Sequence, residues 1–175
     1  MLAQKAFLFG QDSRCEENKL SNKRKVILAC EYALDREAIL NILASEEDVE
    51  IVAAVPRPGD IERLILGQMK AELLVLDIDM FNLDLFDMLR FIRKKAPSLI
   101  VLLIIEKYNE ERIVEAICAG SMGYILKSAS ASELVRCVRA LINGEVWIGR
   151  KMMAKVISKL SLPLNNNSVS IVQGL

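Results

Sequence analysis

Hydrophobic residues follow two alternating patterns between residues 25 and 145. Short, nearly continuous apolar runs rich in β-branched residues alternate five times with longer segments whose apolar residues recur every three or four positions. This alternation is typical of βαβ units and a parallel sheet, whose strands are covered on both faces. The predicted strands are Lys25–Cys30, Val49–Val55, Glu72–Asp77, Leu99–Ile105 and Gly123–Leu126.

Each apolar run is followed by a segment with the period of an amphipathic helix. In the third segment, four apolar residues recur at i, i+3, i+4 and i+7 from Leu85, which predicts one stripe packed on the sheet. The fifth begins with Ser130 and Glu133 in the spacing of a capping box and ends at Asn143 and Gly144, a pair suited to a C-terminal cap. The predicted helices are Leu34–Ala44, Asp60–Met69, Asp84–Lys95, Glu110–Ala119 and Ala131–Asn143.

Five such units predict an α/β fold of the flavodoxin-like (βα)5 type, a five-stranded parallel sheet in the order 2-1-3-4-5 with helices on both faces. We expect an N-terminal extension at 1–24, one domain at 25–145, and a C-terminal helix and linker at 146–175. The helix of this last segment is the amphipathic stretch Arg150–Leu160. In an open sheet of this order, function collects at the carboxyl ends of the strands.

Composition narrows the function classes. Lys plus Arg and Asp plus Glu both number 23, so no excess of positive charge indicates a nucleic-acid surface. The longest apolar run, Leu99–Ile105, is far shorter than the roughly 20 residues of a membrane-spanning helix, so no membrane role is expected. The four cysteines form no metal-ligand spacing, and a reducing cytoplasm is the simplest setting.

Ionisable residues lie at the carboxyl ends of three of the predicted strands, at Glu31, Asp77 and Lys127. One carboxylate at such an edge can accept a phosphoryl group, a second can help to hold a hard cation such as Mg²⁺, and a lysine can pair with phosphoryl oxygens. The cation is needed because a carboxylate that attacks an anionic phosphate must have the charge repulsion neutralised.

Four segments resemble successive motifs of the LuxR/NarL-type response-regulator receiver domain over roughly residues 25–160. They read VILACEYALDREAI, LLVLDIDMFNLDLFDML, EERIVEAICAGSMGYILKSAS and ELVRCVRALINGEVWI. In this resemblance the phosphoacceptor aspartate falls on Asp77, and the lysine that contacts the phosphoryl group falls on Lys127. The implied Mg²⁺ ligands are Glu31, Asp77 and the backbone carbonyl of Asp79. The implied switch positions are Ile105 and Tyr124.

The resemblance also implies partners. A sensor histidine kinase would donate the phosphoryl group, and the phosphorylated domain would control an attached transcriptional output domain. A homodimer is expected through the fourth and fifth βα units, with the stripe of Arg150–Leu160 as additional apolar surface. DNA would be bound only through a helix-turn-helix domain absent from this chain. The protein itself is expected not to be an enzyme.

The chain departs from the family pattern within the site itself. The family has two adjacent acids after the first strand, where this chain has Cys30 and Glu31. The family's Ser or Thr after the fourth strand falls on Ile105, whose hydrocarbon side chain cannot donate a hydrogen bond. The glycines and proline of the loop after the acceptor are replaced by Phe81, Asn82 and Leu85.

These departures leave other readings open. The second hypothesis is an atypical receiver that acts as a phosphorylation-independent dimerisation or protein-interaction module. A third is enzymatic, because LVLDIDMF has the strand-then-DxD form of haloacid-dehalogenase-like phosphatases, although that motif normally lies on the first strand. Cys30 could also be a redox-sensitive thiol, but a lone cysteine beside a buried strand is more often a small hydrophobe.

Overall fold

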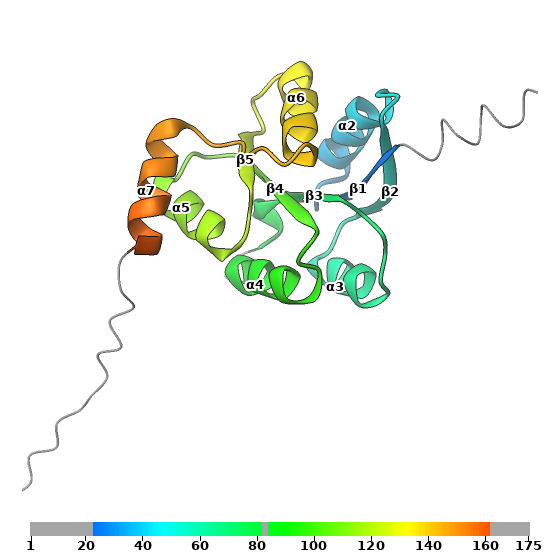
Figure 1. Cartoon of the computed structure of the whole chain (residues 1–175). Helices are drawn as coiled ribbons and strands as arrows, with labels where there is room; N and C mark the ends of the chain where they lie inside the picture. The colour runs from blue at the N-terminus through cyan, green and yellow to red at the C-terminus, as the bar shows by residue number, and fades with distance from the viewer. Residues whose placement is uncertain (1–22, 82–83, 162–175) are drawn as a thin grey trace, which may run out of the picture.

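The computed structural model describes residues 23–81 and 84–161, and the structural statements below concern these ranges. Its centre is a five-stranded parallel sheet in the order β2-β1-β3-β4-β5, as Figure 1 shows. The flavodoxin-like fold class predicted from the sequence is confirmed. The strands are β1 (Arg24–Ala29), β2 (Val49–Val55), β3 (Leu73–Asp77), β4 (Ile100–Ile105) and β5 (Gly123–Leu126). The helices are α2 (Ala33–Ala44), α3 (Pro58–Leu66), the 3-10 turn η1 (Ile78–Met80), α4 (Leu85–Lys95), α5 (Glu110–Ala119), α6 (Ala131–Ile142) and α7 (Arg150–Ser161).

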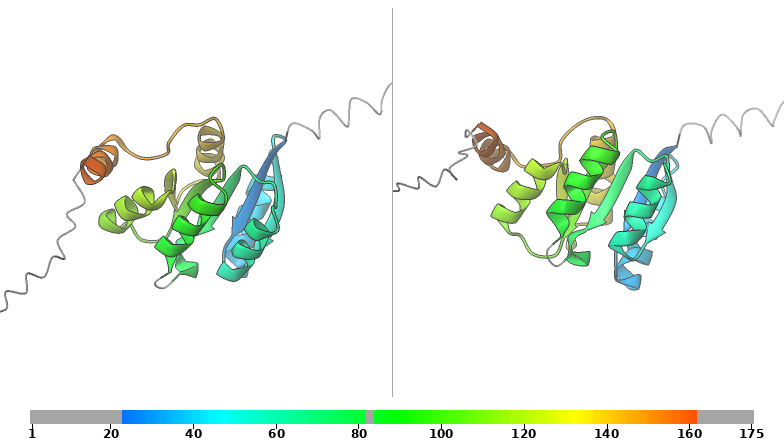
Figure 2. Two further views of the ribbon diagram at one scale, coloured as in Figure 1. Left: turned by 60° about the horizontal axis from the view of Figure 1, so that its bottom comes forward. Right: turned by 90° about the horizontal axis from the view of Figure 1, so that it is seen from below.

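The sheet has a separate hydrophobic core on each face. Every residue of β3 is buried, and alternate residues face opposite sides, so that Leu74 and Leu76 enter one core while Leu73 and Val75 enter the other. The first core is covered by α3, α4 and α5, and the second by α2 and α6. Figures 1 and 2 show these two helical layers on either side of the strands.

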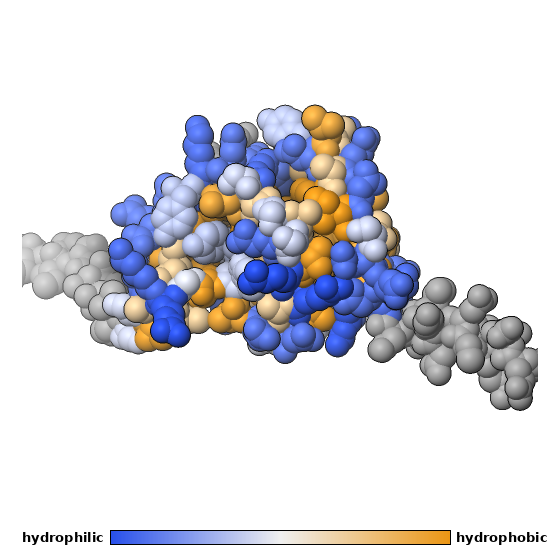
Figure 3. Space-filling model, turned by 90° about the horizontal axis from the view of Figure 1, so that it is seen from above, coloured by the Kyte–Doolittle hydropathy of each residue, from blue (hydrophilic) through white to orange (hydrophobic). Residues whose placement is uncertain are grey.

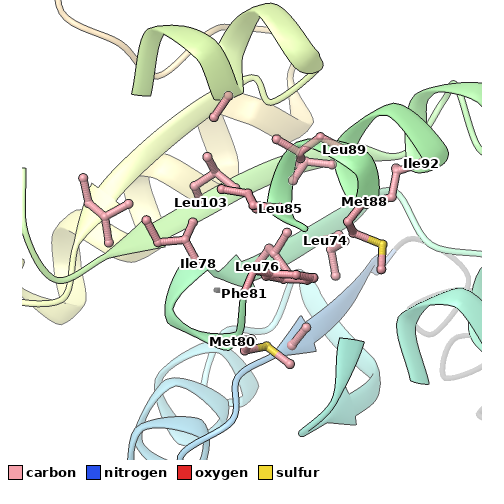
Figure 4. Close-up of a cluster of buried hydrophobic side chains, with 14 of the residues drawn as sticks. Leu74, Leu76, Ile78, Met80, Phe81, Leu85, Met88, Leu89, Ile92 and Leu103 are labelled. Carbon is pink, nitrogen blue, oxygen red and sulfur yellow. The ribbon is translucent and has the colours of Figure 1, made fainter. Parts of the chain in front are cut away.

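Helix α4 illustrates how the sequence pattern becomes packing. The four residues of its predicted stripe are all buried, and Figure 4 shows them lying against side chains of β3 and β4. Burial of a large aliphatic side chain contributes roughly 1.5–3 kcal/mol, so this stripe is a major contribution to the first core. The buried residues are Leu85, Met88, Leu89 and Ile92.

The predicted caps of α6 are present. The Oγ atom of Ser130 accepts a hydrogen bond from the backbone N–H of Glu133 at 3.2 Å. At the other end Gly144 has a φ of 86°, the left-handed conformation that a helix stop of this kind requires. The predicted length of this helix is therefore confirmed to within a residue.

The predicted bounds of the second helix, Asp60–Met69, are wrong. Helix α3 begins at Pro58, whose fixed φ suits the first turn of a helix, and it ends at Leu66. The chain reverses at Gly67 and at Gln68, a non-glycine residue with a φ of 56°. Apolar residues beyond Leu66 continue the helical period in the sequence, but the backbone turn at Gln68 ends the helix earlier.

The segment after α6 lies along the free edge of the sheet. Trp147 forms a parallel bridge with Gly123 of β5, and its N–H donates to the carbonyl of Met122 at 3.1 Å. The N–H of Tyr124 donates in turn to the carbonyl of Trp147 at 3.3 Å. An exposed strand edge invites pairing with another chain, so this segment protects β5.

Helix α7 packs against α5, as all views in Figures 1 and 2 show. Its residues Met152 and Val156 are buried in the first core, and Lys159 pairs with Glu115 at 3.1 Å. Part of the apolar stripe predicted as extra dimer surface is therefore used within the chain. Ile157 remains 55% exposed and Leu160 65% exposed.

The outer surface is a mosaic of polar and apolar side chains. Figure 3 looks down on the molecule from the side of α2 and α6 and shows hydrophilic atoms interspersed with smaller hydrophobic areas. Within residues 23–81 and 84–161, no helix combines the length and hydrophobicity needed to cross a membrane. Residues 1–22 of the predicted extension at 1–24, and residues 162–175 of the predicted C-terminal segment at 146–175, lie outside the described residues.

Candidate functional site

Asp77 is the last residue of β3 and is completely buried. Its Oδ1 atom accepts a hydrogen bond from the backbone N–H of Asp79 at 3.1 Å, which is the cap of the turn η1. Its Oδ2 atom lies 3.2 Å from the thiol of Cys30 and 2.9 Å from the ammonium nitrogen of Lys127. A buried carboxylate is costly unless it is paired, and these three contacts pair it.

The lysine that follows β5 is the centre of the charged cluster. The Nζ atom of Lys127 lies 2.9 Å from Asp77, 2.9 Å from Asp79 and 3.4 Å from Asp35, each measured to a carboxylate oxygen. Burial alone would lower the pKa of Lys127, but hydrogen bonds and charges from Asp77 and Asp79 outweigh burial and raise that pKa. Lys127 therefore stays positively charged throughout the physiological range.

Cys30 directly follows β1, and its thiol lies 3.2 Å from the Asp77 carboxylate. Burial, followed by the hydrogen bond to Asp77 and its negative charge, raises the pKa of the Cys30 thiol to about 12. A thiol with a raised pKa is a poor nucleophile, since the thiolate is the reactive form. This environment favours a role for the Cys30 thiol as a hydrogen-bond donor to Asp77 rather than as a redox-sensitive group.

Glu31, the predicted metal-binding acid, is exposed and its side chain forms no hydrogen bond or ion pair within the described residues. Its backbone carbonyl accepts a hydrogen bond from Arg36 at 3.0 Å, and the carbonyl of Cys30 accepts another at 2.8 Å. Arg36 therefore holds the turn between β1 and α2 without drawing the carboxylate of Glu31 inwards.

Asp35 is the residue of the cluster that sequence reasoning missed. Ligand atoms of Cys30, Asp35 and Asp77 all lie within 4.8 Å of one another. One feature of the sequence could have identified it. Asp35 is an acidic residue in the first turn of the helix after the first strand, and a side chain in that turn can face the strand ends. The position of Asp35, four residues beyond Glu31, does not by itself reveal that its side chain reaches the strand ends.

Asp79 contributes more than the predicted backbone carbonyl. Its carboxylate pairs with Lys127, and its N–H holds Asp77. Asp79 is one-third exposed, so it lies at the mouth of the cluster while Asp77 lies at its base. The strand-end cluster, which we define as Cys30, Asp35, Asp77, Asp79 and Lys127, thus carries three carboxylates, one ammonium and one thiol.

The neighbouring end of β4 is apolar. Ile105 is 1% exposed and packs into the first core, where it also lines a groove of about 320 Å³ with Asp79 and Arg112. The backbone N–H of Lys127 donates to the carbonyl of Ile105 at 2.8 Å, so the two strand ends are joined through the main chain. No side-chain hydroxyl is available at position 105.

Tyr124, the second predicted switch position, lies on β5 and is half-buried. Its ring is tilted by 54° against that of Tyr108, with the centroids 6.1 Å apart. Burial, followed by the influence of Tyr108, raises the pKa of the Tyr124 hydroxyl. The tyrosine pair borders the sheet edge that Trp147 covers.

The sequence also singled out three positions in the loop after Asp77. Of these, Phe81 and Leu85 are buried, and Asn82 lies outside the described residues.

The family model of the response regulator receiver domain matches residues 26–139, more than half of the 175-residue chain. The chain therefore belongs to the response regulator receiver domain family. The resemblance to the LuxR/NarL type is also confirmed by the relatives and structures that match it.

Among curated proteins, the chain is 25% identical over 148 residues to the oxygen regulatory protein NreC of Staphylococcus haemolyticus, covering 83% of this chain and 67% of that protein. It is 27% identical over 138 residues to the uncharacterized transcriptional regulatory protein YxjL of Bacillus subtilis, covering 79% and 63% of the two chains. The chain thus spans about two thirds of the length of the curated relatives it matches.

Solved structures share the fold. The receiver domain of the putative response regulator NarL from Mycobacterium tuberculosis matches with a TM-score of 0.66 and 22% identity, covering 71% of this chain and 99% of that chain. The response regulator ChrA of a heme-sensing two-component system matches with a TM-score of 0.60 and 27% identity, covering 81% and 68% of the two chains.

Proposed function

We propose that this chain is a two-component receiver that accepts a phosphoryl group on Asp77 from a sensor histidine kinase and thereby controls a transcriptional output domain. The observation that carries the proposal is the contact of 2.9 Å between the buried carboxylate of Asp77 and the ammonium of Lys127. A phosphoryl group attached to Asp77 would carry negative charge. The positively charged lysine beside this carboxylate would compensate that charge.

In the proposed transfer, an Oδ atom of Asp77 attacks the phosphorus atom of a phosphohistidine. The new O–P bond forms as the N–P bond breaks, and the electron pair of that bond stays on the histidine nitrogen. Lys127 would then pair with oxygens of the attached group while Asp79 retains its own contact with the lysine. The N–H of Asp79 keeps Asp77 oriented throughout.

The donor set fits a hard cation. Two carboxylates, those of Asp35 and Asp77, lie close enough to share one ion, and Mg²⁺ is commonly held by one or two carboxylates together with water and phosphate oxygens. When bound, Mg²⁺ supplies positive charge that offsets the repulsion between the carboxylate and the incoming phosphate. Glu31 and the carbonyl of Asp79, the other ligands that the sequence suggested, remain part of the proposal.

The proposal is tested by intact-mass analysis after incubation with Mg²⁺ and a small-molecule phosphodonor. The wild-type chain is expected to gain one phosphoryl group, and Asp77→Asn is expected to gain none. Asp87→Asn is the matched control, because Asp87 is an exposed aspartate on α4. An unlabelled wild-type chain, or equal labelling of Asp77→Asn, would contradict the proposal.

One observation favours a second candidate function, a phosphorylation-independent interaction module. Ile105 is almost fully buried hydrocarbon where a hydroxyl would be needed to follow a phosphoryl group. A ligand shifts a conformational equilibrium only through differential contacts, and Ile105 provides no polar contact to change. Absence of label on Asp77, together with retained dimerisation or partner binding, would favour this function.

A further inference from the structure

Two acids follow β1, and they differ in where their carboxylates lie. Glu31 lies two residues after the end of β1, but its side chain is exposed and unpaired within the described residues. Asp35 lies one helical turn further along, and its carboxylate reaches the cluster, with Oδ2 at 3.4 Å from Lys127. The acid that faces Asp77 is therefore not the one adjacent to the strand.

The backbone around Asp35 fixes this arrangement. Helix α2 begins at Ala33, and the carbonyl of Tyr32 accepts the N–H of Arg36 at 2.9 Å. The Arg36 guanidinium bonds the carbonyls of Cys30 and Glu31, so the helix start is tied to the end of β1. The first turn of a helix is also a favourable place for an acidic residue, and Asp35 lies in the first turn of α2.

Asp35 is also the carboxylate that Lys127 can most easily give up. Lys127 keeps Asp77 and Asp79 at 2.9 Å, whereas its contact with Asp35 is longer and Asp35 is 41% exposed. The Asp35 carboxylate can thus turn towards a cation without leaving a buried charge unpaired. Neither Glu31 nor Asp79 combines closeness to Asp77 with a helix-fixed backbone in this way.

From this juxtaposition we propose that Asp35, together with Asp77, is a ligand of the divalent cation. The Asp35 carboxylate would replace the metal-binding acid that is missing from this chain because Cys30 stands in its place. The inference rests on the proposed function, because it concerns the cation of the same site. Cys30 would remain a hydrogen-bond donor to Asp77, and Glu31 would contribute less to cation affinity than Asp35.

The test is a Mg²⁺ titration of the full chain by isothermal calorimetry, with Mg²⁺-dependent thermal stabilisation as a second readout. Asp35→Asn is expected to lower Mg²⁺ affinity at least tenfold, whereas Glu31→Gln is expected to lower it less than twofold. Glu37→Gln is the matched control, because it removes the same charge from an exposed position of the same helix. Thermal unfolding without Mg²⁺ verifies that each variant is folded.

The outcomes separate this inference from the proposed function. Equal Mg²⁺ affinity of wild type and Asp35→Asn, a larger loss in Glu31→Gln, or no Mg²⁺ binding by the wild type would overturn the inference. Phosphoryl labelling of Asp77, measured separately by mass, decides the proposed function in each case. A selective loss in Asp35→Asn without any labelling would support the cation ligand while contradicting phosphotransfer.

Discussion

The ends of β3 and β4 lie side by side in the sheet, yet they carry opposite kinds of side chain. Asp77 on β3 pairs in register with Ile104, one residue before Ile105. Around Asp77 the strand-end cluster is charged and paired through Lys127, whereas the side chain of Ile105 packs into the apolar first core. We refer to the second region, comprising Ile105, Tyr108, Tyr124 and Trp147, as the response region.

This difference teaches that accepting a phosphoryl group and responding to one can be encoded separately. The charged groups that we propose for acceptance lie at the end of β3, after β5 and on α2, and Lys127 joins them through ion pairs. The response region instead depends on a side chain at position 105 that can change partners. The hydrocarbon side chain of Ile105 is buried in the first core and can donate no hydrogen bond to a phosphoryl group.

The largest expected effect concerns the paired charges of the strand-end cluster. Lys127→Met is expected to destabilise the domain by about 3 kcal/mol at neutral pH, because it leaves the buried Asp77 carboxylate without its cation. Urea denaturation measures this effect. Adding Asp77→Asn to that variant should recover most of the loss, and additive losses would show that the pair is not coupled.

A smaller effect is expected when the response region receives a hydroxyl. Ile105→Thr should cost about 2 kcal/mol by loss of buried hydrocarbon and burial of a polar group. It should also make the fluorescence or the NMR signal of Tyr124 more sensitive to phosphorylation than in the wild type. Ile104→Thr is the matched control, since Ile104 is buried in the second core. Equal sensitivity in both variants would contradict the role of position 105.

The sheet edge provides the next test. A Cβ atom on Gly123 would lie 2.8 Å from the Cβ and 2.9 Å from the carbonyl oxygen of Trp147. Gly123→Ala should therefore displace Trp147, cost about 1–2 kcal/mol and shift the emission of this sole tryptophan. Gly149→Ala is the control, because a Cβ there has no neighbour within 4 Å. Unchanged emission in Gly123→Ala would mean that Trp147 does not cover β5 in solution.

The smallest effect lies far from both regions. The hydrogen bond from Arg139 outweighs burial and lowers the pKa of Asp48 below its ordinary 3.8. The resulting stability is fully present above that ordinary pKa and is lost as the pH falls through the lowered value. Because both side chains are about half exposed, Asp48→Asn should cost under about 1 kcal/mol at pH 7 and nothing in strong acid. The exposed Glu47→Gln should not reproduce this pH dependence.

The sequence predicted most of the fold because the fold depends on local periods. The five strands and the stripe from Leu85 follow directly from apolar spacing. The rule that parallel strand ends meet at one edge also predicted that Asp77 and Lys127 would be neighbours, and they lie 2.9 Å apart. Pairing of Trp147 with β5 has no periodic signal, because a single bridge involves too few residues.

The rest of the site depends on orientation, which spacing alone does not define. Whether Glu31 or Asp35 faces Asp77 depends on where α2 begins and on how Arg36 holds the preceding turn. The side-chain contact of Asp79 with Lys127 likewise depends on the 3-10 turn after β3, which no apolar pattern predicted. The roles assigned to these residues stay predictions.

The measurement that tests the central claim most directly is a comparison of backbone amide NMR spectra before and after addition of Mg²⁺ and beryllium fluoride, a phosphoryl mimic. We predict the largest shifts at Cys30, Asp35, Asp77, Asp79 and Lys127, with smaller shifts at Tyr108 and Tyr124. Shifts in the response region as large as those in the strand-end cluster, or no shifts in the strand-end cluster, would contradict this prediction.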